Sequence, residues 1–252
     1  MKRYSVLRMA ALAALMAVTT LLPALAADNV LTAQEKKQGW KLLFDGKSLK
    51  GWGATGRMEG WKVEDGAIAC LASGGGYLYT QEQFGDFTLS VDFKFEPHAN
   101  SGVFLRWSDL NDPVNTGIEI QILDSYGRER MDKHDCGAIY DIIAPSRNMC
   151  KPAGEWNRLV VTCKGPMITV RLNGPVIAQM NVDQWTQPGR NPDGTPNKFR
   201  YAYKDMARVG HIGFQDHGSR VWFRNVKILP LSGTKSSRGA LSSAADLFPS
   251  VR

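Results

Sequence analysis

The chain has 252 residues, of which 43% are hydrophobic and 10% aromatic, so it carries enough apolar material for a full core. Its 25 glycines and 12 prolines exclude collagen-like, coiled-coil and wholly disordered chains, and its length allows one large all-β domain. The formal charge of +7 raises the possibility of a nucleic-acid partner, which depends on where that charge lies.

Residues 1–26 have the composition of a cleavable export signal. Three basic residues come first, an apolar run covers residues 9–22, and Ala24 and Ala26 form a small-residue cleavage site before Ala27. The apolar run is short for a membrane span and no second one follows, so we expect no membrane insertion after the signal is removed. No cysteine stands at the cleavage point. We therefore expect an exported protein, periplasmic or extracellular, without a lipid anchor.

The positive charge is concentrated at the two ends of the chain. Residues 27–231 hold 25 basic and 23 acidic side chains, so most of the excess belongs to the signal and to the Ser-, Gly- and Ala-rich segment 232–252. We expect this last segment to be a flexible tail, and residues 27–37 to lead into one domain over residues 38–231. A nearly neutral body without a basic stripe predicts no nucleic-acid partner.

Four cysteines are present, at positions 70, 136, 150 and 163. An even number in an exported protein suggests disulfides. We favour a Cys136–Cys150 disulfide because these two residues bracket a short loop-like stretch. Cys70 and Cys163 lie in strand-like runs and fit buried thiols equally well. The dispersed spacing argues against zinc.

Apolar and polar residues alternate with a period of two through the body of the chain, most clearly over residues 87–95. Similar runs cover residues 103–106, 118–122, 158–163, 168–172, 176–178, 212–214 and 221–228. Asp65-Gly66 and Asn173-Gly174 each separate two such runs and are typical of tight hairpin turns. Only residues 32–38 have helical character.

About a dozen short strands without intervening helices predict an all-β fold. The expected architecture is a two-sheet antiparallel jelly-roll sandwich. Residues 183–207 are rich in proline, glycine, asparagine and aromatic residues. We expect them to form a surface excursion over one sheet, which is a usual place for a binding loop.

Polar side chains gather on and after several of the predicted strands. They are Asn100, Arg106, Glu119, Gln121, Asp124, Gln215, Asp216 and His217. Glu119 and Gln121 alternate with three isoleucines, so they face away from the core. His217 follows an acid and precedes a glycine, and imidazole beside a carboxylate suits acid–base or metal chemistry. A solvated sheet face is the alternative interpretation of the whole set.

Aromatic residues are numerous in the predicted loops and strands, and most of them suit core packing. Trp107, Tyr140 and Tyr203 are among them. In an exported sandwich such rings are also suited to sugars, because the apolar face of a pyranose stacks on an aromatic ring and its hydroxyls need polar partners. We therefore expect an oligosaccharide or glycoside as the partner.

Eight motifs in order carry a family resemblance. They are residues 39–52 (GWKLLFDGKSLKGW), 61–66 (WKVEDG), 84–87 (FGDF), 100–106 (NSGVFLR), 117–124 (GIEIQILD), 137–140 (GAIY), 151–157 (KPAGEWN) and 210–218 (GHIGFQDHG). Over residues 38–231 the chain resembles the 3-keto-disaccharide hydrolase domain family. The resemblance implies a concanavalin A-like lectin/glucanase type of jelly roll, export, and action on glycosides already oxidised at C3.

A weaker likeness is to laminarinase-type glucanases, whose sheet carries Glu-x-Asp-x-x-Glu. Here the corresponding residues are Glu119, Gln121 and Asp124. The amide in the middle position and the shorter last acid argue against an ordinary retaining mechanism with two carboxylates.

A C3 ketone acidifies the C2 proton, so the group at C1 can leave by elimination and water can add afterwards. Such a site needs a base, an electrophile for the enolate oxygen and an acid for the leaving oxygen. As base we expect Glu119 or His217. As the group that stabilises the enolate oxygen we expect Arg106 or a divalent cation such as calcium, and as the acid for the leaving oxygen Tyr140 or Asp124. The substrate-binding candidates are Asn100, Trp107, Gln121, Tyr203, Gln215 and Asp216.

Two other functions stay open on the sequence. A non-catalytic carbohydrate-binding module shares the fold, the aromatic residues and the export signal, and jelly rolls host both lectins and enzymes. A glucanase on unmodified sugars needs two facing carboxylates, which the pattern at Gln121 disfavours. No ligand motif with diagnostic spacing identifies a metal, and no organic cofactor is expected.

Overall fold

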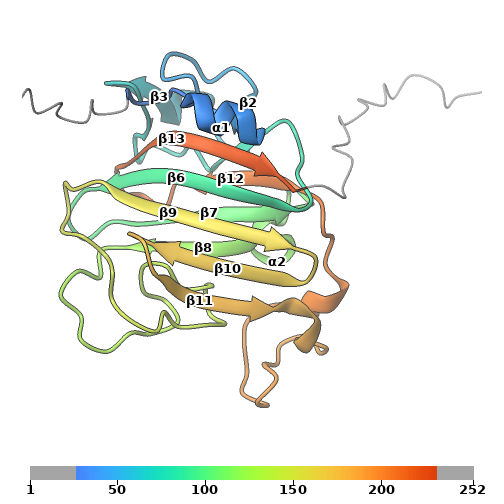
Figure 1. Ribbon diagram of the computed structural model, residues 1–252. Coiled ribbons are helices and arrows are strands. Elements are labelled where there is room, and N and C mark those ends of the chain that lie inside the picture. The colour runs from blue at the N-terminus through green and yellow to red at the C-terminus, as the bar shows by residue number, and fades with distance from the viewer. Residues whose placement is uncertain (1–26, 232–252) are drawn as a thin grey trace, which may run out of the picture.

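A computed structural model describes residues 27–231, and Figure 1 shows them as two packed layers of strands. The expected export signal and the expected tail lie outside the described residues. The described part is all-β, with two antiparallel sheets and few helices, as the alternation predicts. No helix in residues 27–231 is both long and apolar enough to cross a membrane.

The larger sheet has eight strands in the order β11-β10-β9-β6-β13-β4-β3, with β1 paired to β13. Its strands are β1 (Lys41–Leu42), β3 (Trp61–Glu64), β4 (Ala67–Cys70), β6 (Phe87–Phe95), β9 (Asn157–Lys164), β10 (Met167–Leu172), β11 (Val176–Asn181) and β13 (Val221–Pro230). The smaller sheet has five, in the order β2-β5-β12-β7-β8. They are β2 (Trp52–Ala54), β5 (Tyr77–Thr80), β7 (Asn100–Trp107), β8 (Ile118–Leu123) and β12 (His211–Gln215).

The core lies between the two sheets and follows from the alternation of side chains along each strand. In β6 every second residue from Phe87 to Phe95 is at most 1% exposed. In β8 the three isoleucines are buried in the same core, which leaves Glu119 and Gln121 on the outer face of the smaller sheet. The sequence prediction of this face is confirmed.

Both predicted hairpin turns are present. Asp65 and Gly66 join β3 to β4, and Asn173 and Gly174 lie between β10 and β11. All four residues have positive φ, from 48° to 119°. Asn, Asp and Gly tolerate this conformation, which is why such pairs make the turns that match the twist of two antiparallel strands.

The predicted helix is α1 (Ala33–Gln38), and its start is fixed by a capping box between Thr32 and Glu35. The structure corrects one expectation, because the body also contains α2 (Pro113–Thr116) and three 3-10 turns: η1 (Met58–Gly60), η2 (Val182–Gln184) and η3 (Tyr203–Asp205). α2 is a four-residue turn with a proline at its start. Segments this short have no periodicity to detect.

Candidate active site

A pocket of about 180 Å³ opens over the outer face of the smaller sheet. It is lined by Tyr77, Asn100, Val114, Glu119, Gln121, Tyr140, Lys198, Gln215 and His217. Strands β5, β7, β8 and β12 supply the floor, while Val114, Tyr140, Lys198 and His217 come from segments that surround it. Six residues that the sequence predicts at the site therefore meet here. They are Asn100, Glu119, Gln121, Tyr140, Gln215 and His217.

Among residues 27–231, Glu119 is the only carboxylic acid that lines this pocket. It stands opposite Phe104, and its side chain leans over Gly102, where a Cβ would come within 2.2 Å of Oε1. Glycine at 102 therefore gives the carboxyl group its room. Burial raises the pKa of Glu119 to about 7, and the positive charge of Lys198 opposes that rise. A carboxyl group with such a pKa can act as acid or base near neutral pH.

Neutral amides occupy the floor beside Glu119. Gln121 donates to the Asn100 side-chain oxygen at 3.1 Å, and Gln215 donates to the Tyr77 hydroxyl at 3.2 Å. Burial raises the pKa of Tyr77 above its usual value, so its phenol stays protonated. These groups offer hydrogen bonds to hydroxyls without adding a second charge.

Lys198 reaches the pocket from the long excursion between β11 and β12. Its Nζ lies 4.1 Å from the centre of the Tyr140 ring, and His134 packs edge-on against the same ring. The backbone N–H of Tyr140 donates to the Glu119 carbonyl at 3.0 Å, which fixes Tyr140 beside β8. The predicted binding excursion 183–207 thus contributes a cation to the site.

Arg106 is not at the pocket, which corrects its expected position. β7 has a bulge at this point, where its pairing with β12 shifts between His211 and Gly213, and Arg106 takes φ 50°. The bulge turns the side chain inward, where it is 1% exposed and donates to Asp86 and to backbone carbonyls. Arg106 therefore holds loops together instead of facing a substrate.

Two of the predicted acids also do not line the pocket. Asp124 accepts from the His98 backbone N–H, and Asp216 accepts from the backbone N–H groups of Gly75 and Gly218. Both carboxylates satisfy the backbone of neighbouring turns. The sequence spacing Glu-x-Gln-x-x-Asp therefore does not bring two carboxylates together.

Two aromatic residues expected to touch the sugar lie below the surface. Trp107 is fully buried and packs against Tyr77, with ring centres 5.5 Å apart. Tyr203 is 2% exposed and packs against Phe199 in the excursion. Both support residues that line or flank the pocket, so they act through packing and not as exposed platforms.

All four cysteines are free thiols, so the predicted Cys136–Cys150 disulfide is not formed in the structure. The two thiols are nevertheless neighbours, since each shifts the pKa of the other. Cys70 and Cys163 are buried in β4 and β9, and burial raises the pKa of each thiol to about 12. In residues 27–231 no group of three or more His, Cys, Asp or Glu side chains is arranged to hold a metal ion.

Sequence reasoning missed Tyr77, Val114 and Lys198 as lining residues. Tyr77 and Val114 lie in β5 and α2, two elements that the sequence analysis did not predict. Lys198 lies in the excursion that was predicted to bind, but no local pattern distinguishes it from the other basic residues there.

A two-sheet β-sandwich with an acid, amides and phenols over one outer face is an architecture shared by carbohydrate-binding proteins and carbohydrate-active enzymes. The comparisons with known proteins narrow this class. The family model for the 3-keto-alpha-glucoside-1,2-lyase-like domain matches residues 39–229. The chain belongs to this family.

Three relatives are similar over most of their length. The 3-keto-disaccharide hydrolase of Bacteroides thetaiotaomicron is 27% identical over 225 residues, which cover 75% of this chain and 78% of that protein. A Parabacteroides distasonis protein described provisionally as a glycosyl hydrolase has a crystal structure with TM-score 0.69, 33% identity and coverage of 76% of this chain and 99% of that one. A second such protein from the same species has a crystal structure with TM-score 0.67 and 30% identity, and the match covers 81% of this chain and 100% of that one.

Proposed function

We propose that the chain cleaves glycosides oxidised at C3, with Glu119 as the base that removes the C2 proton. The observation that carries this proposal is the single carboxyl group of the pocket and its pKa of about 7. Ordinary glycosidases place two carboxyl groups on either side of the scissile bond. A C3 ketone needs only one base, because the carbonyl itself makes the neighbouring C–H acidic. The names of the family and of the Bacteroides relative support the same substrate class.

In the proposed reaction Glu119 takes the proton from C2, and the electrons of that bond form an enolate with the C3 oxygen. The Lys198 ammonium group is placed to stabilise this negative charge, since it lies at the same pocket and acts on Glu119. The enolate then expels the C1 oxygen, which leaves as an alcohol after it gains a proton. Water adds across the new C1–C2 double bond and gives a free 3-keto sugar.

The leaving oxygen needs a proton donor. Tyr140 and His217 both line the pocket, and neither side chain makes an ion pair or a hydrogen bond within residues 27–231. His217 is exposed at the rim, whereas Tyr140 is half-buried beneath Lys198. Either group can deliver a proton to the alcohol without a second carboxylate. Gln121, Asn100 and Gln215 hold the sugar hydroxyls.

Product analysis on matched substrates tests the proposal. The purified protein is incubated with a 3-keto-glucoside and with the same glucoside unoxidised, in H₂O and in D₂O. We expect release of the alcohol only from the keto substrate, with deuterium at C2 of the sugar product. Cleavage of both substrates without deuterium uptake contradicts proton abstraction, and binding without cleavage of either identifies a carbohydrate-binding module.

We also propose that the protein acts outside the cytoplasm. The supporting observation is the pattern of residues 1–26, with basic residues, an apolar run and a small-residue cleavage site. Fractionation of cells that express the full chain tests this proposal, together with N-terminal sequencing of the exported product. We expect it to begin at Ala27, and full-length protein confined to the cytoplasm is the contrary result.

A further inference from the structure

Asp141 lies at a junction beside the pocket and has three partners. Its carboxylate accepts from the Lys133 ammonium at 2.7 Å, from the His134 ring at 3.1 Å and from the Lys198 backbone N–H at 3.1 Å. The side chain is 10% exposed. A buried carboxylate needs such partners to remain charged. Burial would raise the pKa of Asp141, but the hydrogen bonds and the Lys133 charge hold it below its usual value.

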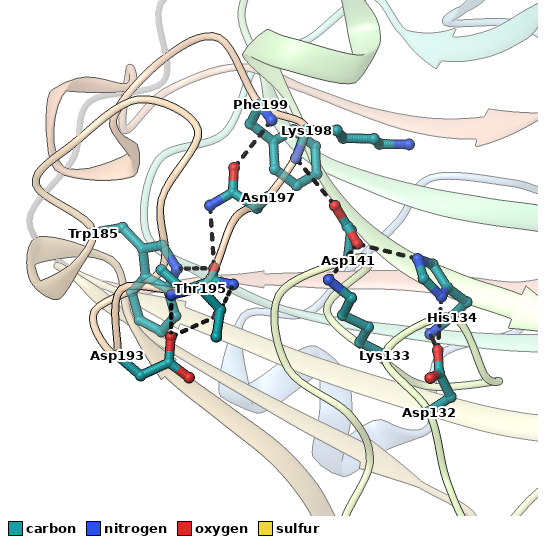
Figure 2. A network of polar contacts seen from close by, with 11 residues as sticks. Asp132, Lys133, His134, Asp141, Trp185, Asp193, Thr195, Asn197, Lys198 and Phe199 are labelled. Carbon is teal, nitrogen blue, oxygen red and sulfur yellow. Dashed lines mark hydrogen bonds and ion pairs between the residues drawn. The ribbon is translucent and has the colours of Figure 1, made fainter.

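The residues on either side of this junction belong to the candidate site. Tyr140, the neighbour of Asp141, is bonded through its backbone to Glu119, and its ring lies under the Lys198 ammonium. Asp141 itself takes φ 60°, a conformation that side chains rarely adopt, so the chain turns sharply at this point. Figure 2 shows Asp141 between His134 and Lys133 on one side and the backbone of Lys198 on the other.

The segment that carries Lys198 has little regular structure of its own. Around it, Asn197 donates to Asn191 and accepts from the Phe199 N–H, and both contacts are internal to the excursion. The bond from the Lys198 N–H to Asp141 instead connects the excursion to the segment that follows β8 (Figure 2). A lysine on a flexible stem loses its fixed position when its backbone moves.

We propose that Asp141 is a positioning residue, which fixes the Lys198 ammonium beside the Glu119 carboxyl by joining the excursion to the segment that is bonded to β8. The inference rests on the proposed function, in which Glu119 is the base and Lys198 is the cation that stabilises the enolate. Asp141 does not line the pocket. It acts through Lys198.

The consequence appears in the titration of Glu119. Burial raises the pKa of Glu119, and Lys198 is the charge that lowers it again. The other titratable groups near this carboxyl are Tyr77 and Tyr203, which stay neutral because burial raises their pKa values, and Tyr140 and His217 at the same pocket. When Lys198 is released, its ammonium group no longer attracts the Glu119 carboxylate, while Glu119 stays buried. The pKa of Glu119 therefore rises.

The experiment measures the pKa of Glu119 by ¹³C NMR of the side-chain carboxyl in the full chain, without substrate. We expect Asp141→Ala and Lys198→Met each to raise it by about one pH unit, since a nearby opposite charge moves a carboxyl pKa by 1–3 units. The double variant should match Lys198→Met alone, because Asp141 acts only through that lysine. Asp141→Asn keeps an oxygen for the Lys198 N–H and should stay near the wild-type value.

Asp193→Ala is the matched control. Asp193 is a carboxylate of the same excursion that accepts from Thr195, and its loss should leave the Glu119 pKa unchanged. If Asp141→Ala does not fold, Asp141→Ser is measured in its place, because it also removes the carboxylate and leaves a smaller void. An unchanged pKa in the folded Asp141 variant, or a further rise in the double variant, overturns the proposal, as does an Asp141→Asn value as high as that of Asp141→Ala.

The measurement separates the two proposals. A protein that shows the expected titrations but does not cleave 3-keto-glycosides contradicts the proposed function and leaves the role of Asp141 intact. A protein that cleaves them while its Glu119 pKa ignores Asp141 contradicts only the positioning role.

Discussion

The outward faces of the two sheets both carry charged side chains and aromatic rings, but these groups are paired with one another to a different extent on each face. On the larger sheet Lys94 lies between two indoles, 5.1 Å from the centre of Trp156 and 4.9 Å from that of Trp222. Arg224 stacks on Trp156 at 4.0 Å, and Arg220 lies 5.1 Å from Trp222. Both of these indole rings are covered by cations.

The acids of the larger sheet are also paired. Glu64 accepts from the Arg220 guanidinium at 2.6 Å and from the Trp222 N–H at 3.2 Å. Asp92 accepts two hydrogen bonds from Arg158. On the smaller sheet, by contrast, the Glu119 carboxyl is governed by burial and by the charge of Lys198, without a hydrogen bond from residues 27–231. A group left without partners over a pocket is thus a better sign of a site than charge and aromaticity alone.

The largest expected effect distinguishes Glu119 from Glu64. Glu119→Gln removes the proposed base and should lower kcat/KM on a 3-keto-glucoside by about a thousandfold, within the range of general base catalysis. Glu64→Gln is the same change on the other sheet and should leave kcat/KM unaltered. Steady-state kinetics at pH 8 measure both. Equal losses in the two variants, or none in Glu119→Gln, contradict the assignment of the base.

The second prediction concerns the cysteines of the two regions. Cys136 and Cys150 are neighbours beside β8, whereas Cys70 and Cys163 are separate thiols of the larger sheet. Glutathione disulfide should take two electrons and two protons from the first pair and form the Cys136–Cys150 disulfide. Closing a loop of about 15 residues should raise the free energy of unfolding by about 3 kcal/mol. Cys70 and Cys163 should remain thiols, because burial raises their pKa to about 12.

Peptide mapping after oxidation checks the pairing, and urea unfolding checks the stability. The variant Cys136→Ser serves as the control, since it removes one partner and should show no gain on oxidation. Mixed disulfides at Cys70 or Cys163 contradict the distinction between the two regions.

The sequence predicts the fold well because sheets are encoded locally. Alternation over residues 87–95 and the Asn173-Gly174 turn each follow from neighbouring residues, and both are present in the structure. The outward position of Glu119 and Gln121 follows from the same rule. The position of Arg106 does not, because one extra residue in β7 reverses the alternation, and a bulge has no reliable local signature.

The rest of the site depends on contacts between distant segments. Lys198 reaches the pocket of Glu119 from an excursion that folds back on Asp141, 57 residues earlier in the chain, and on α2 through Arg200. Asp124 and Asp216 belong to the right stretches of sequence, but each turns toward a backbone N–H near its own turn. The sequence spacing of these acids is the same whether or not such a hydrogen bond forms. Only the structure therefore distinguishes an acid that lines the pocket from one that binds a backbone N–H group.

The third prediction follows from the pKa of Glu119. The unfolded chain releases this proton near its ordinary value of 4.5, while the folded protein keeps it up to about pH 7. Between these values the folded state binds more protons, so the free energy of unfolding falls as pH rises. Glu119→Gln has no such penalty and should exceed the wild-type stability by about 3 kcal/mol at pH 8.5, but not at pH 4.5. Urea unfolding at both pH values tests this, and a gain that is the same at both contradicts it.

The smallest expected effect compares two lysines, each of which lies over aromatic rings. Lys94→Met and Lys198→Met keep the length of the side chain and remove its charge. At pH 5, where the Glu119 carboxyl is protonated in the folded protein, each should lower the free energy of unfolding by less than about 1 kcal/mol, since a cation over a partly exposed ring is worth about that much. Only Lys198→Met should lower kcat/KM on a 3-keto-glucoside, because only that cation lies at the pocket that holds Glu119. If Lys94→Met lowers it equally, both faces contribute to activity, and the contrast between a paired face and an unpaired one is wrong.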